Sequence, residues 1–123
     1  VRSSAASDVY KRQELVHVGI NNDNLEEAQK LRDTLCLLFN LEPRDGKKSV
    51  FAGKEFECLR EHFLGTNGHI AMQTENLEAA VEELKEKGFS FRMETAAYNA
   101  EGKLSNIYLD GEFGGFAIHI LQK

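Results

Sequence analysis

An internal repeat with a constant offset runs through the chain. His17 is followed by the segment Asn24-Leu25-Glu26, and His69 is followed at the same distance by Asn76-Leu77-Glu78. Two copies are too few for a solenoid, which needs at least about three stacked repeats. We therefore predict a duplicated half-domain, in which both halves share one order of elements.

Each half predicts a strand, a helix and three further strands. β-rich runs at 15–20 and 69–74 precede Asn24 and Asn76, which are favourable helix N-caps. Short strands separated by turns then follow, at 55–60 in the first half and at 89–95, 104–109 and 116–121 in the second. Apolar residues recur at helical spacing between them: Leu25, Ala28, Leu31, Leu35 and Leu38, then Leu77, Ala80, Val81 and Leu84. The predicted fold class is α+β, with two βαβββ units that form one curved, cup-like mixed sheet and helices on its convex face.

The length of 123 residues suits one domain. We predict that domain over residues 14–123, with its first unit at 14–62 and its second at 67–123. Residues 1–13 are small and polar, begin without Met, lack the apolar run of a signal peptide, and resemble translated adapter sequence. We expect this tail to be disordered, and it looks unlike a native segment; the sequence leaves open whether it belongs to the natural protein.

The charge balance excludes some partners. The net charge of −5 argues against nucleic acid and against anionic membrane surfaces, because both require a basic face. The two cysteines, Cys36 and Cys58, are too few for a disulfide framework, so we expect a reducing cytoplasm and two buried, unreactive thiols.

The first and last strands of each unit share one alternation. Their apolar positions are expected to pack against the helices: Val16, Val18, Ile20, Phe56, Cys58, Ile70, Met72, Phe116, Ile118 and Ile120. The opposite face carries His17 and His69 at matching positions, and Glu57 and His119 at another matching pair. Three imidazoles and one carboxylate are typical of a divalent metal site. The alternative is an ordinary hydrated sheet face. His62, the remaining histidine, is expected to be exposed.

The segments HVGINNDNLEEAQKL, GTNGHIAMQTENLEAAVEELKEKG and IYLDGEFGGFAIHILQK carry a family resemblance. Over residues 14–123 the chain resembles the vicinal-oxygen-chelate superfamily, the fold of glyoxalase I, bleomycin-resistance proteins and extradiol dioxygenases. Its second half also resembles a small domain associated with bacterial 2-keto-3-deoxy-6-phosphogluconate/4-hydroxy-2-oxoglutarate aldolases.

The resemblance implies a metal held by His17, Glu57, His69 and His119, with Zn²⁺, Ni²⁺, Mn²⁺ or Fe²⁺ all compatible. His119 stands where the superfamily usually has Glu, which leaves Glu57 as the carboxylate for ligation or for catalytic proton transfer. Arg60, Arg92 and Tyr108 are candidates to contact an anionic substrate. The expected protein is a cytoplasmic homodimer.

Four functions remain open from the sequence. The first is a glyoxalase-like lyase or isomerase that acts on a small 2-oxo or vicinal-oxygen substrate, with a possible link to 2-oxo sugar-acid metabolism. The second is a metal-free small-molecule binding module, and the third is a non-catalytic partner of an aldolase. The fourth is an Fe(II) dioxygenase that uses His17, His69 and Glu57.

Overall fold

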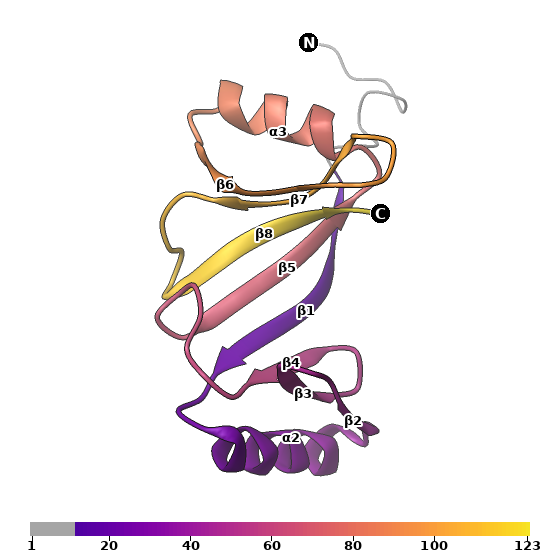
Figure 1. Cartoon of the computed structure of the whole chain (residues 1–123), viewed down its shortest axis with the longest axis vertical. Helices are drawn as coiled ribbons and strands as arrows, with labels where there is room; N and C mark the ends of the chain where they lie inside the picture. The colour runs from indigo at the N-terminus through magenta and orange to yellow at the C-terminus, as the bar shows by residue number, and fades with distance from the viewer. Residues whose placement is uncertain (1–11) are drawn as a thin grey trace. The chain divides into compact units, whose positions relative to one another are not determined.

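The structure, a computed structural model, describes residues 12–123. Its elements follow the order βαβββ twice, as the repeat predicted (Figure 1). The first set is β1 (Gln13–Asn21), α2 (Leu25–Phe39), β2 (Pro43–Asp45), β3 (Ser49–Ala52) and β4 (Phe56–Leu59). The second set is β5 (Gly68–Thr74), α3 (Leu77–Glu86), β6 (Phe91–Tyr98), β7 (Leu104–Leu109) and β8 (Phe116–Gln122).

The strands form one eight-stranded sheet in the order β2-β3-β4-β1-β5-β8-β7-β6. The sheet is mixed, because β1 pairs with β4 in parallel whereas β3–β4, β6–β7 and β7–β8 are antiparallel. This sheet and the two helices found in residues 12–123 confirm the α+β fold class. Neither of those helices is long and apolar enough to cross a membrane.

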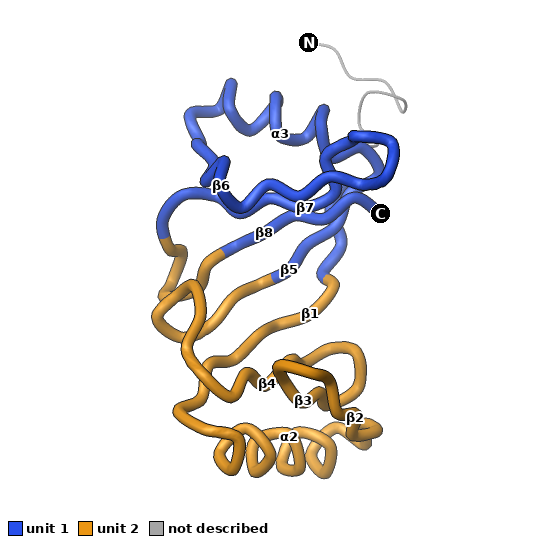
Figure 2. The backbone as a smooth tube through the Cα atoms, in the orientation of Figure 1, with its two compact units in different colours: residues 1–15, 71–111, 118–123 blue, residues 16–70, 112–117 orange. Residues whose placement is uncertain are grey.

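The chain divides into two compact units (Figure 2). Unit 2 comprises residues 16–70 and 112–117, and unit 1 comprises the described residues 12–15 together with 71–111 and 118–123. The division therefore passes through β1, β5 and β8 instead of following the boundaries of the repeat. Gln13, which we expected in the disordered tail, is the first residue of β1. The expectation for residues 1–11 lies outside the described residues.

Both predicted N-caps are present. The Asn24 side chain accepts a hydrogen bond from the Glu27 backbone N–H at 2.8 Å, and Asn76 accepts one from Ala79 at 3.1 Å. Each cap satisfies a backbone donor that the first turn of a helix leaves without an internal partner. The helices therefore begin where the sequence predicted.

The core of unit 2 lies between α2 and the strands β3 and β4. Ala28, Val50 and Cys58 are buried there, with Leu31 and Leu35 packed against them. Leu38, which we predicted on the same apolar stripe, is 67% exposed. At about 100° per residue, Leu38 lies roughly 80° around the helix from Ala28, at the margin of the buried face.

The core of unit 1 lies between α3 and its strands. Its buried members are Leu77, Val81, Phe91, Leu104, Ile107, Leu109 and Ile120, with Ile118 packed against them. Seven of the ten apolar residues that we expected beneath the helices are only half-buried and belong to neither cluster: Val16, Val18, Ile20, Phe56, Ile70, Met72 and Phe116. The expectation is confirmed for Cys58, Ile118 and Ile120, which belong to the clusters, and for Phe56, whose ring stacks on Phe39 of α2 with centroids 5.9 Å apart. For the other six it stays a prediction.

Replacement of a cap residue should lower stability without changing the fold. We expect Asn24→Ala to lower the free energy of unfolding by about 1 kcal/mol, because the Glu27 N–H loses its acceptor. Denaturant unfolding monitored by circular dichroism measures the change. Asn24→Asp keeps an acceptor and should remain close to the wild type; an equal loss in both variants would contradict the capping role.

The Cys58 thiol should be inert in the native protein. It is fully buried in the unit 2 core, and burial raises its pKa to about 11, so very little reactive thiolate exists at pH 8. In a Cys36→Ser variant, where Cys58 is the remaining thiol, we expect reaction with a disulfide reagent to be at least about a hundredfold faster in denaturant than in buffer. Equal rates would show that the thiol is accessible in the folded state.

Candidate metal centre

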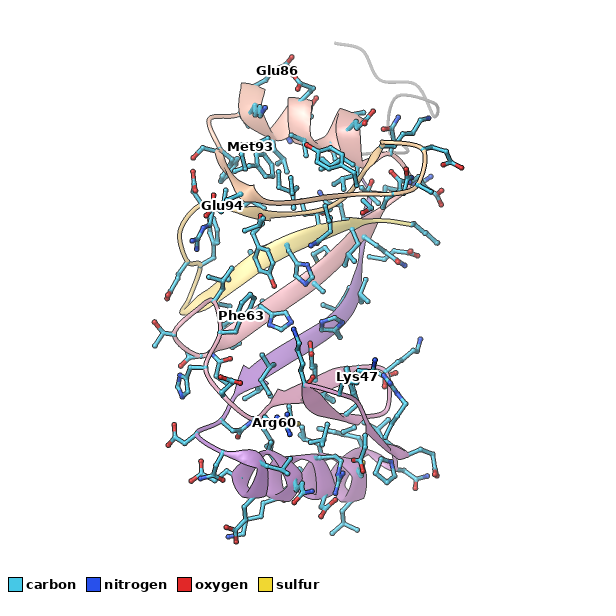
Figure 3. All side chains as sticks on the ribbon, in the orientation of Figure 1. Lys47, Arg60, Phe63, Glu86, Met93 and Glu94 are labelled. Carbon is cyan, nitrogen blue, oxygen red and sulfur yellow. The ribbon has the colours of Figure 1, made fainter. Side chains whose placement is uncertain are left out.

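Strands β4, β1 and β5 are neighbours in the sheet, and each supplies one side chain to the site in unit 2. β4 supplies Glu57, β1 supplies His17 and β5 supplies His69. Side chains alternate along a strand, so Glu57 points away from the α2 face that its neighbour Cys58 occupies. Arg60, by contrast, follows the end of β4 and is exposed (Figure 3).

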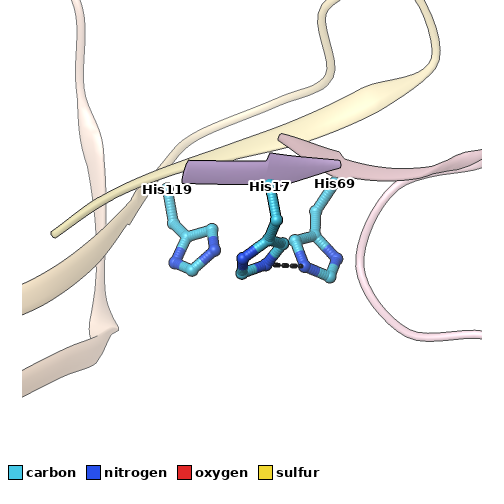
Figure 4. A group of neighbouring side chains, drawn as sticks. All are labelled: His17, His69 and His119. Carbon is cyan, nitrogen blue, oxygen red and sulfur yellow. Dashed lines mark hydrogen bonds between the residues drawn. The ribbon is translucent and has the colours of Figure 1, made fainter. Parts of the chain in front are cut away.

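The three side chains converge through three atoms. The Nε2 atoms of His17 and His69 are 3.2 Å apart (Figure 4). Oε1 of Glu57 lies 3.3 Å from the first and 3.2 Å from the second. The two rings meet edge to face, with an interplanar angle of 84°. Two imidazole nitrogens and one carboxylate oxygen therefore occupy the corners of a nearly equilateral triangle.

The size of this triangle fits a divalent ion. With bonds of about 2.0–2.1 Å, neighbouring ligands are roughly 3.3–3.4 Å apart in a tetrahedral shell and about 3.0 Å apart in an octahedral one. The observed edges of 3.2–3.3 Å fall between these values. The three atoms can therefore form one face of either shell, and each is a donor that divalent transition metals accept.

Gly19 allows the triangle to form. It pairs with Glu57 across the β1–β4 ladder, and a Cβ at this position would overlap the imidazole ring of His69. The backbones of β4 and β5 lie on either side of β1, roughly 10 Å apart. Glu57 and His69 can reach each other across β1 because Gly19 has no side chain. Sequence reasoning missed this residue, although the His-x-Gly spacing placed it on the histidine face.

Electrostatics keep Glu57 ionised. The side chain is only 20% exposed, and this burial alone would raise its pKa. Hydrogen bonds from His17, His69 and Ser49 outweigh the burial and hold the pKa of Glu57 well below its usual range. A carboxylate with such a low pKa is a good metal ligand and a weak base. The predicted catalytic role of Glu57 in proton transfer stays a prediction.

His119 has its own supporting residues in unit 1. Its Nδ1 donates a hydrogen bond to Oδ1 of Asn106 at 2.7 Å. Its ring stacks on Tyr108 with centroids 4.4 Å apart. Because an amide oxygen only accepts, Nδ1 carries a proton; in the neutral ring this leaves the lone pair on Nε2, which is the form of imidazole that binds a metal. Sequence analysis singled out His119 and Tyr108 but missed Asn106.

The three predicted histidines form a group that can hold a metal ion. His17, His69 and His119 each offer one ring nitrogen, and these atoms all lie within 4.8 Å of one another (Figure 4). The remaining histidine, His62, is exposed as expected and pairs with Asp23 at 3.0 Å.

Two predicted substrate residues share a face with His119. Arg92 is opposite Tyr108 across the β6–β7 ladder, and Tyr108 is opposite His119 across the β7–β8 ladder. Residues directly opposite on adjacent strands point to the same side of a sheet. The Arg92 guanidinium currently pairs with Glu94 at 3.0 Å. Substrate contact by Arg92, Tyr108 or Arg60 stays a prediction.

Comparisons with known proteins support the fold and give no function. No family model matches the chain, and no curated protein matches it. Among solved structures, the chain is similar to the hypothetical protein BH1468 from Bacillus halodurans C-125, with 17% sequence identity and a TM-score of 0.59. The similarity covers 91% of this chain and 95% of that one.

Gly19→Ala should disturb the site without removing any candidate ligand. The added methyl group occupies the space of the His69 ring, so we expect that ring to move away from His17. In NMR spectra, the nuclear Overhauser contacts between the His17 and His69 imidazoles should disappear, with a loss of about 1–3 kcal/mol in unfolding free energy. Val18→Ala, on the opposite face of β1, should retain the contacts. Persistence of the contacts in Gly19→Ala would refute the spacing role.

Proposed function

We propose that this protein binds one divalent metal ion through His17, Glu57 and His69 and uses it in catalysis. The observation that carries the proposal is the triangle formed by two imidazole Nε2 atoms and one carboxylate oxygen, with edges of 3.2–3.3 Å. A buried group of this kind is costly unless its charge is balanced. Catalytic metal sites commonly have three protein ligands and leave further positions for substrate.

The chain's own residues have distinct tasks in this proposal. His17 and His69 present neutral nitrogens, whereas Glu57 supplies negative charge that offsets part of the charge on the ion. His119, oriented by Asn106 and Tyr108, is the additional imidazole of the group. When bound, the ion supplies Lewis-acid polarisation of substrate oxygens. The donor set is compatible with Zn²⁺, Ni²⁺, Mn²⁺ and Fe²⁺.

The function that we favour is a metal-dependent lyase or isomerase that acts on a small 2-oxo or vicinal-oxygen substrate. Three observations support this function. They are the duplicated βαβββ order, the position of the candidate ligands His17, Glu57 and His69 on one face of the sheet, and the resemblance to the vicinal-oxygen-chelate superfamily. Arg92 and Tyr108, on the face of His119, provide a cation and a hydroxyl for an anionic end of such a substrate. Assembly as a homodimer and association with 2-oxo sugar-acid metabolism remain parts of this proposal.

An Fe(II) oxygenase is the second candidate. Two histidines and one carboxylate on one face are the ligand set of non-haem Fe(II) oxygenases, and His17, His69 and Glu57 meet in that combination. Oxygen consumption by the Fe²⁺-loaded protein, absent with Zn²⁺ or Ni²⁺, would favour this candidate over a lyase or isomerase.

Elemental analysis tests metal binding directly. After incubation with Zn²⁺, Ni²⁺, Mn²⁺ or Fe²⁺ and removal of excess metal, we expect about one ion per chain. His69→Ala and Glu57→Gln should each weaken binding by about a hundredfold or more, because a ligand is lost from a site with few others. His62→Ala, which changes an exposed histidine paired with Asp23, is the matched control and should bind as the wild type does.

Two outcomes would contradict the metal proposal. One is a wild-type protein that takes up none of the four ions, which would favour a metal-free binding module. The other is unchanged metal content in His69→Ala and Glu57→Gln. If metal binds as expected, a screen of 2-oxo acids and 2-oxoaldehydes with the loaded wild type and His69→Ala tests the catalytic part separately.

A further inference from the structure

Ser49 forms a hydrogen bond with the carboxylate oxygen of Glu57 that does not contact the histidines. Its Oγ donates a hydrogen bond to Oε2 at 2.6 Å, whereas both imidazoles contact Oε1. Ser49 is 5% exposed. The two oxygens of one carboxylate therefore have separate partners, and the partner of Oε2 is a buried hydroxyl.

The register of β3 and β4 explains this contact. Phe51 is the residue opposite Glu57, and Ser49 lies two positions along on the same face. The intervening residue, Val50, points into the core beneath α2 together with Cys58. Because that core anchors both strands, the hydroxyl is fixed beside the carboxylate. Oε2 has a second lone pair, but a turn of the carboxylate that brings Oε2 toward the histidines would lengthen or bend this hydrogen bond.

We propose that Ser49 is a specificity-determining residue that holds Glu57 in the orientation for ligation through Oε1 alone and so disfavours Mn²⁺ relative to Zn²⁺. The inference rests on the proposed metal function. Zn²⁺ is satisfied by four ligands, one of which can be a single carboxylate oxygen. Mn²⁺ prefers oxygen ligands and a larger shell, so it gains more from a second carboxylate oxygen. Hydrogen bonds to charged groups are strong enough to make this difference measurable.

The test measures metal affinity, not activity. Wild type, Ser49→Ala and Ser49→Thr, each stripped of metal with a chelator, are titrated with Zn²⁺ and Mn²⁺ in competition with a chromophoric chelator. We expect the Zn²⁺/Mn²⁺ affinity ratio to fall roughly tenfold in Ser49→Ala, while Ser49→Thr, which retains a hydroxyl, stays close to the wild type. Co²⁺-loaded Ser49→Ala should also show weaker visible absorption than Co²⁺-loaded wild type, as expected for a larger shell.

Two controls separate specificity from damage to the fold. Thermal melting of the metal-free proteins reports any loss of stability in Ser49→Ala. Ser105→Ala removes a hydroxyl that donates to the Ala97 backbone carbonyl and should leave the Zn²⁺/Mn²⁺ ratio unchanged.

The measurements distinguish failure of the Ser49 role from failure of the metal function. An equal loss of affinity for both ions in Ser49→Ala, or no change for either, would overturn the specificity role and leave the metal function standing. A wild type that binds neither ion would refute the metal function, and the role of Ser49 with it. A lowered ratio in Ser49→Ala but not in Ser49→Thr supports both.

Discussion

The contact of two imidazoles with a single oxygen of Glu57 is the interaction on which the rest of the site depends. The carboxylate is largely buried, and a buried charge is costly unless several donors surround it. His17 and His69 meet Oε1, and Ser49 meets Oε2. Together these three residues keep the carboxylate charged in a place where burial alone would favour its protonated form.

The alternation of side chains along the strands positions the residues that make this contact. Beneath α2, Cys58 and Val50 pack into the core, so the neighbouring Glu57 and Ser49 must face the other way. A helix that packs well on β3 and β4 therefore also fixes the carboxylate and its hydroxyl partner. On the central strand, Gly19 leaves the space in which the His69 ring lies. The residues that position the ligands are thus ordinary parts of the fold.

Much of the fold and of the candidate site could be predicted from the sequence. The repeat predicted βαβββ twice, and strand alternation placed His17, Glu57 and His69 on one face. One prediction failed because it depended on where a helix lies. Leu38 shared the apolar spacing of α2 but lies at the margin of its buried face and is exposed. Periodicity shows which residues share a face, but it does not show how much of that face a helix covers.

By itself, the sequence determined the order of elements, the two helix starts and the face on which the candidate ligands lie, because these follow from local propensity and from the two-residue period of a strand. Only the tertiary structure decided which strands are neighbours and how far apart the donor atoms are. The parallel pairing of β1 with β4 joins segments far apart in the chain, and the roles of Gly19, Ser49 and Asn106 arise from such contacts. Long-range pairing and side-chain packing depend on contacts between segments that are distant in the sequence. Only such contacts show that a glycine leaves room for a ring or that a serine donates a hydrogen bond to a carboxylate.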